Sequence, residues 1–122
     1  MPHRRYFSIP FIEFIRSIPD IAAQNFSADA VFRFLRCGFS ELLDSEIDVL
    51  ENYVLACGVR GKNAWDKKWV RLPKHKAGYD LELLNQSREY IMEMLKPVYQ
   101  VFSDKKSTVK DYVLTIYKLI VL

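Results

Sequence analysis

The chain has 122 residues, enough for one domain that buries roughly two-thirds of the surface its unfolded chain would expose. Half of its residues are hydrophobic, 27% are charged, and only four are glycine and five proline, which excludes the disordered and low-complexity classes. No apolar run approaches the ~18 residues of a membrane-spanning helix, and residues 1–6 lack the apolar stretch of a signal peptide, so we expect a cytoplasmic protein without membrane contact.

Two helices are expected in the N-terminal third of the chain. Pro10 suits a first helical turn, and apolar residues recur at three-to-four spacing from 11 to 18. Pro19 lacks a backbone donor and clashes with the preceding turn, so we expect this helix to break or kink there. Ser27 can cap the free N–H groups of a second helix, which Gly38 should end in a left-handed conformation.

Three further helices follow the same pattern. Ser45 begins the third, and Gly58 ends it. Asp80 begins the longest helix, and Thr108 with Asp111 resembles the capping box that opens the last one. Because no alternating strand pattern occurs anywhere, the sequence predicts an all-α fold, an irregular bundle of about five helices that forms a single domain over residues 1–122.

The long connection over about residues 59–79, here called the basic loop, shows no periodicity. The stretch from Arg60 to Lys76 contains seven basic residues and one acid, a formal charge of +6, whereas the remaining 11 basic and 14 acidic residues give −3. Tryptophans are interleaved with these cations. Cations can neutralise phosphates and aromatic rings can stack on bases, which predicts contact with nucleic acid. The predicted contact residues are Arg60, Lys62, Trp65, Lys67, Lys68, Trp69 and Arg71.

The basic loop also has a purely structural interpretation, in which it is solvated and Trp65 and Trp69 anchor it to the helices. No motif for catalysis accompanies it: the chain has no phosphate-cradling glycine loop, HExxH, CxxC or GxSxG sequence. His3 and His75 lie among basic residues, and the acids between 41 and 51 suit helix starts. We therefore predict no catalytic residues and no metal site, and no enzyme activity for this chain on its own.

Several motifs resemble the B subunit of bacterial AddAB-type (RexAB) helicase-nucleases. They are VFRFLRCGF at 31–39, IDVLENYVLA at 47–56, GVRG at 58–61 and the following Trp65. The stretch IPFIEFIRS at 9–17, and Leu84-Asn85 with Arg88, extend the resemblance to nearly the whole chain. Arg36-Cys37 stands where the family's Leu-Lys-Thr-Gly run has Lys-Thr, so the basic residue is kept.

The resemblance implies that the chain is an excised internal fragment of a much larger subunit, in a region like the 2B subdomain of superfamily 1 helicases. The apolar end at 119–122 is expected of a cut segment. The family uses ATP to unwind DNA from broken ends and degrades the strands, preparing recombinational repair. Its ATP, Mg and iron-sulfur cluster would bind outside this segment, so we expect no cofactor here. The implied partners are DNA, the A subunit and the rest of the same chain.

Two functions remain open at this point. In the first, the chain is a non-catalytic helical domain that contacts DNA through the basic loop. In the alternative, it is a docking module whose apolar C-terminal helix and aromatic loop contact the partner subunit or the neighbouring helicase-like domains. The alternative predicts that Tyr112, Tyr117 or Ile120 is exposed.

Overall fold

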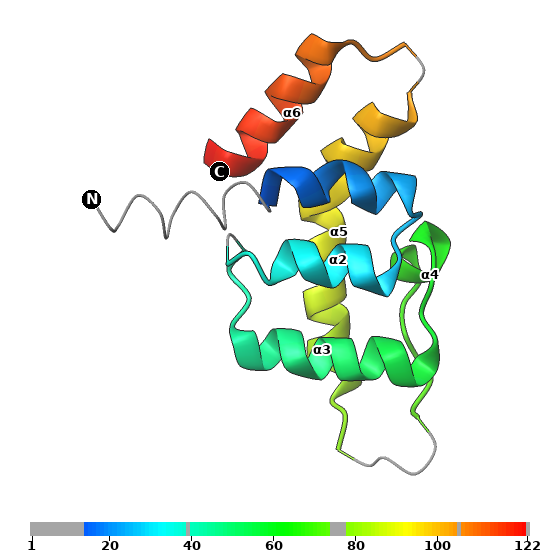
Figure 1. Ribbon diagram of the computed structural model, residues 1–122. Helices are drawn as coiled ribbons and strands as arrows, with labels where there is room; N and C mark the ends of the chain where they lie inside the picture. The colour runs from blue at the N-terminus through cyan, green and yellow to red at the C-terminus, as the bar shows by residue number, and fades with distance from the viewer. Residues whose placement is uncertain (1–13, 39, 74–77, 105, 122) are drawn as a thin grey trace, which may run out of the picture.

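The structure is a computed structural model that describes residues 14–38, 40–73, 78–104 and 106–121, with the backbone alone at 103 and 119–121. Every regular element in these ranges is an α-helix, so the predicted all-α bundle is confirmed (Figure 1). In chain order the helices are a segment over residues 14–23, α2 (Ala28–Leu35), α3 (Asp44–Cys57), α4 (Lys62–Asp66), α5 (Leu81–Ser103) and α6 (Val109–Val121). None of the helices in the described ranges combines the length and the apolar character that crossing a membrane requires.

The helices are arranged around α5. Figure 1 shows the 14–23 segment, α2 and α3 as a layer that crosses α5, while α6 folds back along one end of α5. The basic loop, which contains α4, connects α3 to α5 along one edge of this layer. The fully buried side chains between the layer and α5 include Ile18, Ile21, Val31, Leu35, Leu50, Val54, Ile91 and Leu95.

Local capping explains where most helices begin and end. Ser27 Oγ accepts the backbone N–H of the third residue of α2 at 3.2 Å, as predicted. Asp80 caps α5 by accepting two N–H groups of its first turn. Thr108 and Asp111 form a reciprocal capping box, with Thr108 N donating to Asp111 Oδ2 at 2.8 Å and Asp111 N donating to Thr108 Oγ1 at 3.3 Å. Gly58 ends α3 with φ +63°.

Of the break or kink predicted at Pro19, the break is wrong. Residues 14–23 are helical without interruption, although Pro19 removes one backbone donor from the ladder. An unbroken helix keeps Phe14, Ile18 and Ile21 on one face, and all three are buried in the core. Their burial, worth about 1.5–3 kcal/mol for each large apolar side chain, offsets the loss of one hydrogen bond.

Helix α6 packs against α5 and divides its apolar residues between two faces. Tyr112 stacks on Phe102 of α5, with ring centroids 4.6 Å apart, and Ile116 is half-buried beside them. Val109, Val113 and Tyr117 lie on another face of the helix and are 75%, 59% and 62% exposed. The predicted exposure of Tyr117 is therefore confirmed, Tyr112 is half-buried, and the Ile120 side chain lies outside the described residues.

Candidate nucleic-acid interface

Two glycines set the entrance to the basic loop. Gly58 adopts φ +63° at the end of α3, and Gly61 adopts φ +87° immediately before α4. A Cβ atom on Gly61 would lie 3.3 Å from Asn25 Nδ2, and Asn25 Oδ1 accepts the backbone N–H of Lys62 at 3.3 Å. The Gly-Val-Arg-Gly motif therefore turns the chain sharply at α3 and brings it against the turn that precedes α2.

Both tryptophans of the basic loop are buried. Trp65 is fully buried and Trp69 is 6% exposed, and their ring centroids lie 5.2 Å apart in an edge-on arrangement. Phe32 of α2 and Tyr53 of α3 pack beside them. The predicted anchoring role is thus confirmed. Both indole rings are occupied within the core, so stacking of Trp65 or Trp69 on a nucleobase would require the basic loop to open.

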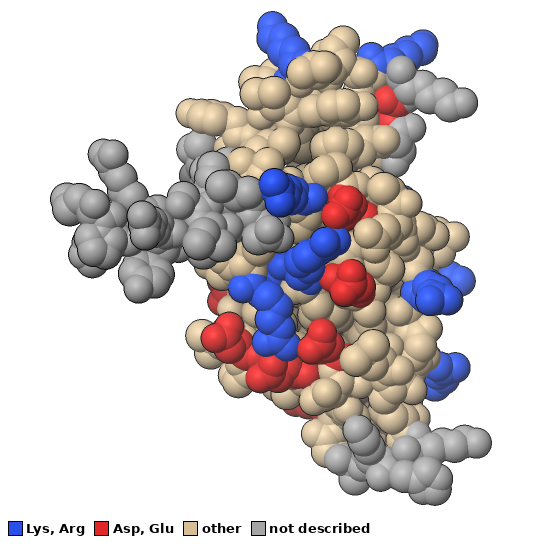
Figure 2. Space-filling model, in the orientation of Figure 1, with Lys and Arg blue, Asp and Glu red and all other residues tan. Residues whose placement is uncertain are grey.

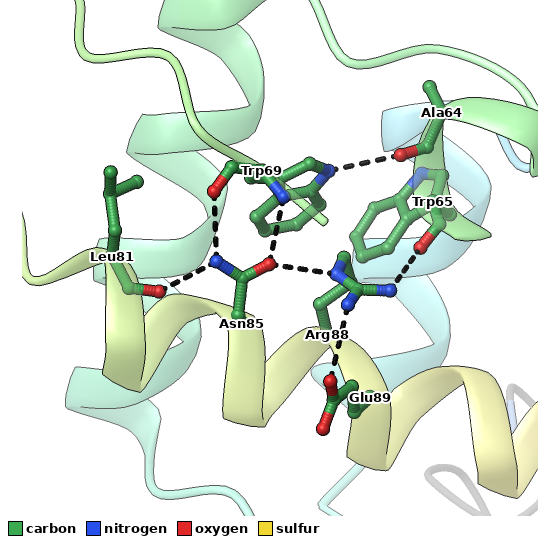
Figure 3. A network of polar contacts seen from close by, with 7 residues as sticks. All are labelled: Ala64, Trp65, Trp69, Leu81, Asn85, Arg88 and Glu89. Carbon is green, nitrogen blue, oxygen red and sulfur yellow. Dashed lines mark hydrogen bonds and ion pairs between the residues drawn. The ribbon is translucent and has the colours of Figure 1, made fainter. Parts of the chain in front are cut away.

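A polar network from α5 holds the backbone of the basic loop (Figure 3). Asn85 Oδ1 accepts the N–H of Trp69 at 2.8 Å, and Asn85 Nδ2 donates to the carbonyl groups of Trp69 and Leu81, both at 2.9 Å. Arg88 Nη1 donates to the carbonyl of Trp65 at 2.9 Å, and Arg88 Nε donates to Asn85 Oδ1 at 3.0 Å. Trp69 Nε1 donates to the carbonyl of Ala64 at 3.1 Å, which closes the loop on itself.

These two polar residues of α5 lie within the core. Asn85 is 6% exposed and Arg88 is 5% exposed, and the Arg88 guanidinium pairs with the exposed Glu89, with Arg88 Nη2 and Glu89 Oε1 3.5 Å apart. Sequence reasoning noted Asn85 and Arg88 only as part of a resemblance and assigned them no role. Their role in holding the backbone of the basic loop had one signal in the sequence. An Asn and an Arg lie three residues apart beside Leu84 and Ile91, on a helix face that is otherwise apolar.

The five cations among the predicted contact residues divide into two groups. Arg60, Lys67 and Lys68 are exposed, and within the described ranges they form no ion pair with a carboxylate. Lys62 and Arg71 have partners within the chain. Lys62 Nζ lies 4.1 Å from the centroid of the Tyr99 ring and 3.6 Å from Asp66, and the Arg71 guanidinium donates to the carbonyl of Cys57.

Tyr53 connects the end of the basic loop to the core. Its hydroxyl donates to the carbonyl of Arg71 at 2.6 Å while its ring is buried against Trp69 and Tyr79. Burial, followed by the interaction with the Cys57 thiol, raises the pKa of Tyr53 to about 12. The hydroxyl therefore stays protonated, and remains a hydrogen-bond donor, to a higher pH than the hydroxyl of an ordinary tyrosine.

Charges are arranged differently on the face formed by α2 and α3. Arg33 pairs with Asp20 at 2.8 Å, and Arg36 pairs with Asp48 at 2.7 Å and with Glu51 at 3.0 Å. The two carboxylates raise the pKa of Arg36, Asp48 more than Glu51. Figure 2 shows basic and acidic side chains alternating here, whereas those at the edge over α4 and the following segment have no acidic neighbour in view. Within the basic loop, the described cations available to an external anion are therefore Arg60, Lys67 and Lys68; outside it, exposed lysines without an ion pair in the described ranges are Lys96, Lys106, Lys110 and Lys118.

A shallow hollow of about 530 Å³ lies beside the basic loop. Its lining residues are Lys68, Trp69, Val70, Leu81, Glu82, Asn85, Gln86 and Glu89. Glu82 and Glu89 place negative charge on the α5 side of Lys68, which disfavours an anion inside the hollow. Among the described residues no group of three or more His, Cys, Asp or Glu side chains is placed to hold a metal ion.

The fold and this surface define an all-α domain that carries a firmly held, lysine-containing loop. No family model matches the sequence. The chain is 42% identical over 113 residues to the B subunit of the ATP-dependent helicase/deoxyribonuclease of Lachnoclostridium phytofermentans, which is 91% of this chain and 10% of that protein. It is 33% identical over 121 residues to the protein of the same name from Caldanaerobacter subterraneus subsp. tengcongensis, which is 92% of this chain and 10% of the relative.

A third relative covers less of the chain. The corresponding B subunit of Clostridium acetobutylicum is 49% identical over 57 residues, which is 46% of this chain and 5% of that protein. The chain is thus homologous to a segment of the B subunit of ATP-dependent helicase/deoxyribonucleases, and the resemblance predicted from its motifs is confirmed. Two of these relatives align with nearly the whole of this chain, and the aligned segment is 10% of the length of each relative.

Proposed function

We propose that this chain is a non-catalytic helical domain of the B subunit of an ATP-dependent helicase/deoxyribonuclease, and that it contacts the DNA backbone through Arg60, Lys67 and Lys68. The observation that carries the proposal is the contrast between these exposed cations, which lack a carboxylate partner in the described ranges, and the paired arginines of α2. An unpaired surface cation can exchange its counterions for phosphates, which favours binding without sequence preference.

The relatives' names and the motifs support a larger role. In the proposed setting the domain acts within the complete B subunit, together with the A subunit, on DNA ends during double-strand break processing and recombinational repair in the cytoplasm. ATP, Mg and the iron-sulfur cluster would bind elsewhere in that assembly. The domain, in a region like the helicase 2B subdomain, would bind DNA without sequence preference. Other domains of the assembly would carry out unwinding and strand cleavage.

Charge reversal at two lysines tests the proposal. We expect Lys67→Glu/Lys68→Glu to weaken binding of a short fluorescent DNA duplex at low salt at least tenfold, measured by anisotropy, because two attractive charges become repulsive. The matched control is Lys96→Glu/Lys118→Glu, which reverses two exposed lysines outside the basic loop and changes the net charge equally. If both double variants weaken binding to the same extent, or neither does, the basic loop is not the contact surface.

The exposed face of α6 favours a second function, docking. Val109, Val113 and Tyr117 follow one another at four-residue spacing and form an apolar stripe on the helix surface. The relatives are about ten times longer than this chain, so most of the length of a complete B subunit is absent here. We propose that the stripe packs against the rest of the same B-subunit polypeptide.

Thiol labelling distinguishes a covered stripe from an exposed one. A Val113→Cys variant should react rapidly with a maleimide in the 122-residue chain and at least tenfold more slowly in a full-length B subunit carrying the same substitution, because burial blocks the reagent. Peptide mapping separates this site from Cys37 and Cys57. Glu93→Cys on the exposed side of α5 is the control, and equal rates at position 113 in both proteins would contradict docking.

A further inference from the structure

We infer that Asn85 and Arg88 are positioning residues that hold Lys67 and Lys68 ready for phosphate contact. This inference rests on the proposed DNA contact of the basic loop and extends it to two residues that would touch no DNA. The two lysines are the second and third residues after Trp65 and directly precede Trp69. They therefore occupy a short turn whose two ends are both fixed to α5.

The two ends of this turn are held by different side chains. Arg88 Nη1 binds the carbonyl of Trp65 at 2.9 Å. Asn85 binds the N–H and the carbonyl of Trp69 at 2.8 and 2.9 Å, so that the backbone of this residue is held on both sides (Figure 3). The buried indole rings fix the same two positions from the core. The turn between them has little freedom to reorient.

The holding residues also hold each other. Arg88 Nε donates to Asn85 Oδ1, and Asn85 Nδ2 donates to the carbonyl of Leu81 one turn earlier on α5. These contacts determine which way the Asn85 amide faces, with its oxygen toward two donors and its nitrogen toward two carbonyl groups. A buried network of this kind is strong when every member is satisfied and is sensitive to the loss of any one.

Fixing the turn has a direct consequence for binding. A loop that is already ordered loses less conformational entropy when a ligand binds, so its affinity exceeds that of a mobile loop with the same charges. Lys67 and Lys68 are exposed while the backbone on either side of them, at Trp65 and Trp69, is held, which is the arrangement that preorganised phosphate contact requires.

Arg88→Lys tests the positioning role without changing the net charge. A lysine ammonium cannot reproduce the guanidinium fork that reaches both Asn85 and the Trp65 carbonyl. We expect faster hydrogen exchange at the Trp69 N–H, a three- to tenfold loss of DNA affinity at low salt, and a shallower salt dependence. Arg33→Lys, on an exposed arginine of α2, is the matched control and should change none of the three readouts.

Asn85→Ala serves as a second variant because it releases the other end of the turn, also without a change of charge. Retained affinity and salt dependence in both variants, despite faster exchange at Trp69, would overturn the inference, as would unchanged exchange. Failure of both variants to fold, judged by circular dichroism, would also overturn it, because the network would then be required for folding of the core and would have no separate role in positioning Lys67 and Lys68. If Lys67→Glu/Lys68→Glu leaves DNA binding intact, the proposed function itself fails.

Discussion

Asn85 of α5 grips the backbone of Trp69 on both sides, accepting its N–H at 2.8 Å and donating to its carbonyl at 2.9 Å. The loop has no regular secondary structure at Trp69, so its backbone groups have no partner in a helix or sheet. The Asn85 side chain supplies their hydrogen bonds instead. The contact lies almost entirely out of water, with Asn85 6% exposed. Its loss should therefore be felt in stability as well as in the order of the loop.

Asn85→Ala should lower the free energy of unfolding by about 2–4 kcal/mol, because it leaves the buried Trp69 N–H and carbonyl without partners. Urea denaturation followed by circular dichroism measures this change. Gln86→Ala, at the exposed neighbouring position, is the control and should shift stability by less than about 0.5 kcal/mol. Equal effects of the two substitutions would show that the Asn85 contacts are not formed in solution.

Gly61→Ala should destabilise the chain more than Gly58→Ala. Gly58 has φ +63° and ψ +37°, a left-handed conformation that costs alanine about 1 kcal/mol, and nothing lies within 4 Å of its Cβ position. Gly61 has φ +87° and ψ +155°, a region used almost only by glycine, and its Cβ would meet Asn25 at 3.3 Å. We expect about 2–3 kcal/mol for Gly61→Ala by urea denaturation, and a reversed order of the two variants would contradict this geometry.

Tyr53 should make stability fall in alkaline solution. Its pKa is raised from 10.0 to about 12, so the folded chain retains a proton that the unfolded chain loses first. The stabilisation is complete below pH 10 and is lost as the pH rises from about 10 to about 12, by about 3 kcal/mol in all. Tyr53→Phe should be less stable at pH 8, because it lacks the bond to the Arg71 carbonyl, but should lose less stability between pH 10 and 11.

The pH dependence is measured by urea denaturation of both proteins at pH 8, 10 and 11. The difference between the two proteins reports the Tyr53 hydroxyl together with its interaction with the Cys57 thiol. Parallel curves would mean that the hydroxyl is not buried as described.

Glu82→Gln should strengthen DNA binding roughly twofold at low salt, since Glu82 lines the same hollow as Lys68 and opposes its charge. Anisotropy titrations at two salt concentrations measure the effect, which should shrink as salt increases. Glu93→Gln removes the same charge from an exposed position of α5 outside the hollow and should have a smaller effect. Equal effects would indicate that only net charge matters.

Local signals in the sequence predicted much of the fold. Ser27, Asp80 and the Thr108–Asp111 pair act through residues two or three positions away, so their capping could be inferred from neighbouring letters alone. Anchoring of Trp65 and Trp69 was one of two interpretations of the basic loop, beside contact with nucleic acid, and the sequence alone did not decide between them. The helix does not break at Pro19, because the burial of Ile18 and Ile21 outweighs the local preference of proline.

The parts that sequence reasoning missed depend on distant contacts. Arg88 meets Trp65 across 23 positions, and Asn25 meets Lys62 across 37. No local rule links such residues, and an Asn and an Arg on a helix are ordinarily read as solvent-facing. The same distance explains why the seven predicted contact residues could not be divided in advance into exposed cations, paired cations and buried rings.

The most direct measurement is the salt dependence of DNA binding for the unmodified chain and for Lys67→Gln/Lys68→Gln. If both lysines neutralise phosphates, the slope of log affinity against log salt should become shallower by about 1.8 for duplex DNA, about 0.9 for each contact. Lys96→Gln/Lys118→Gln should leave the slope unchanged. A slope that stays the same when Lys67 and Lys68 are neutralised would contradict DNA contact through the basic loop.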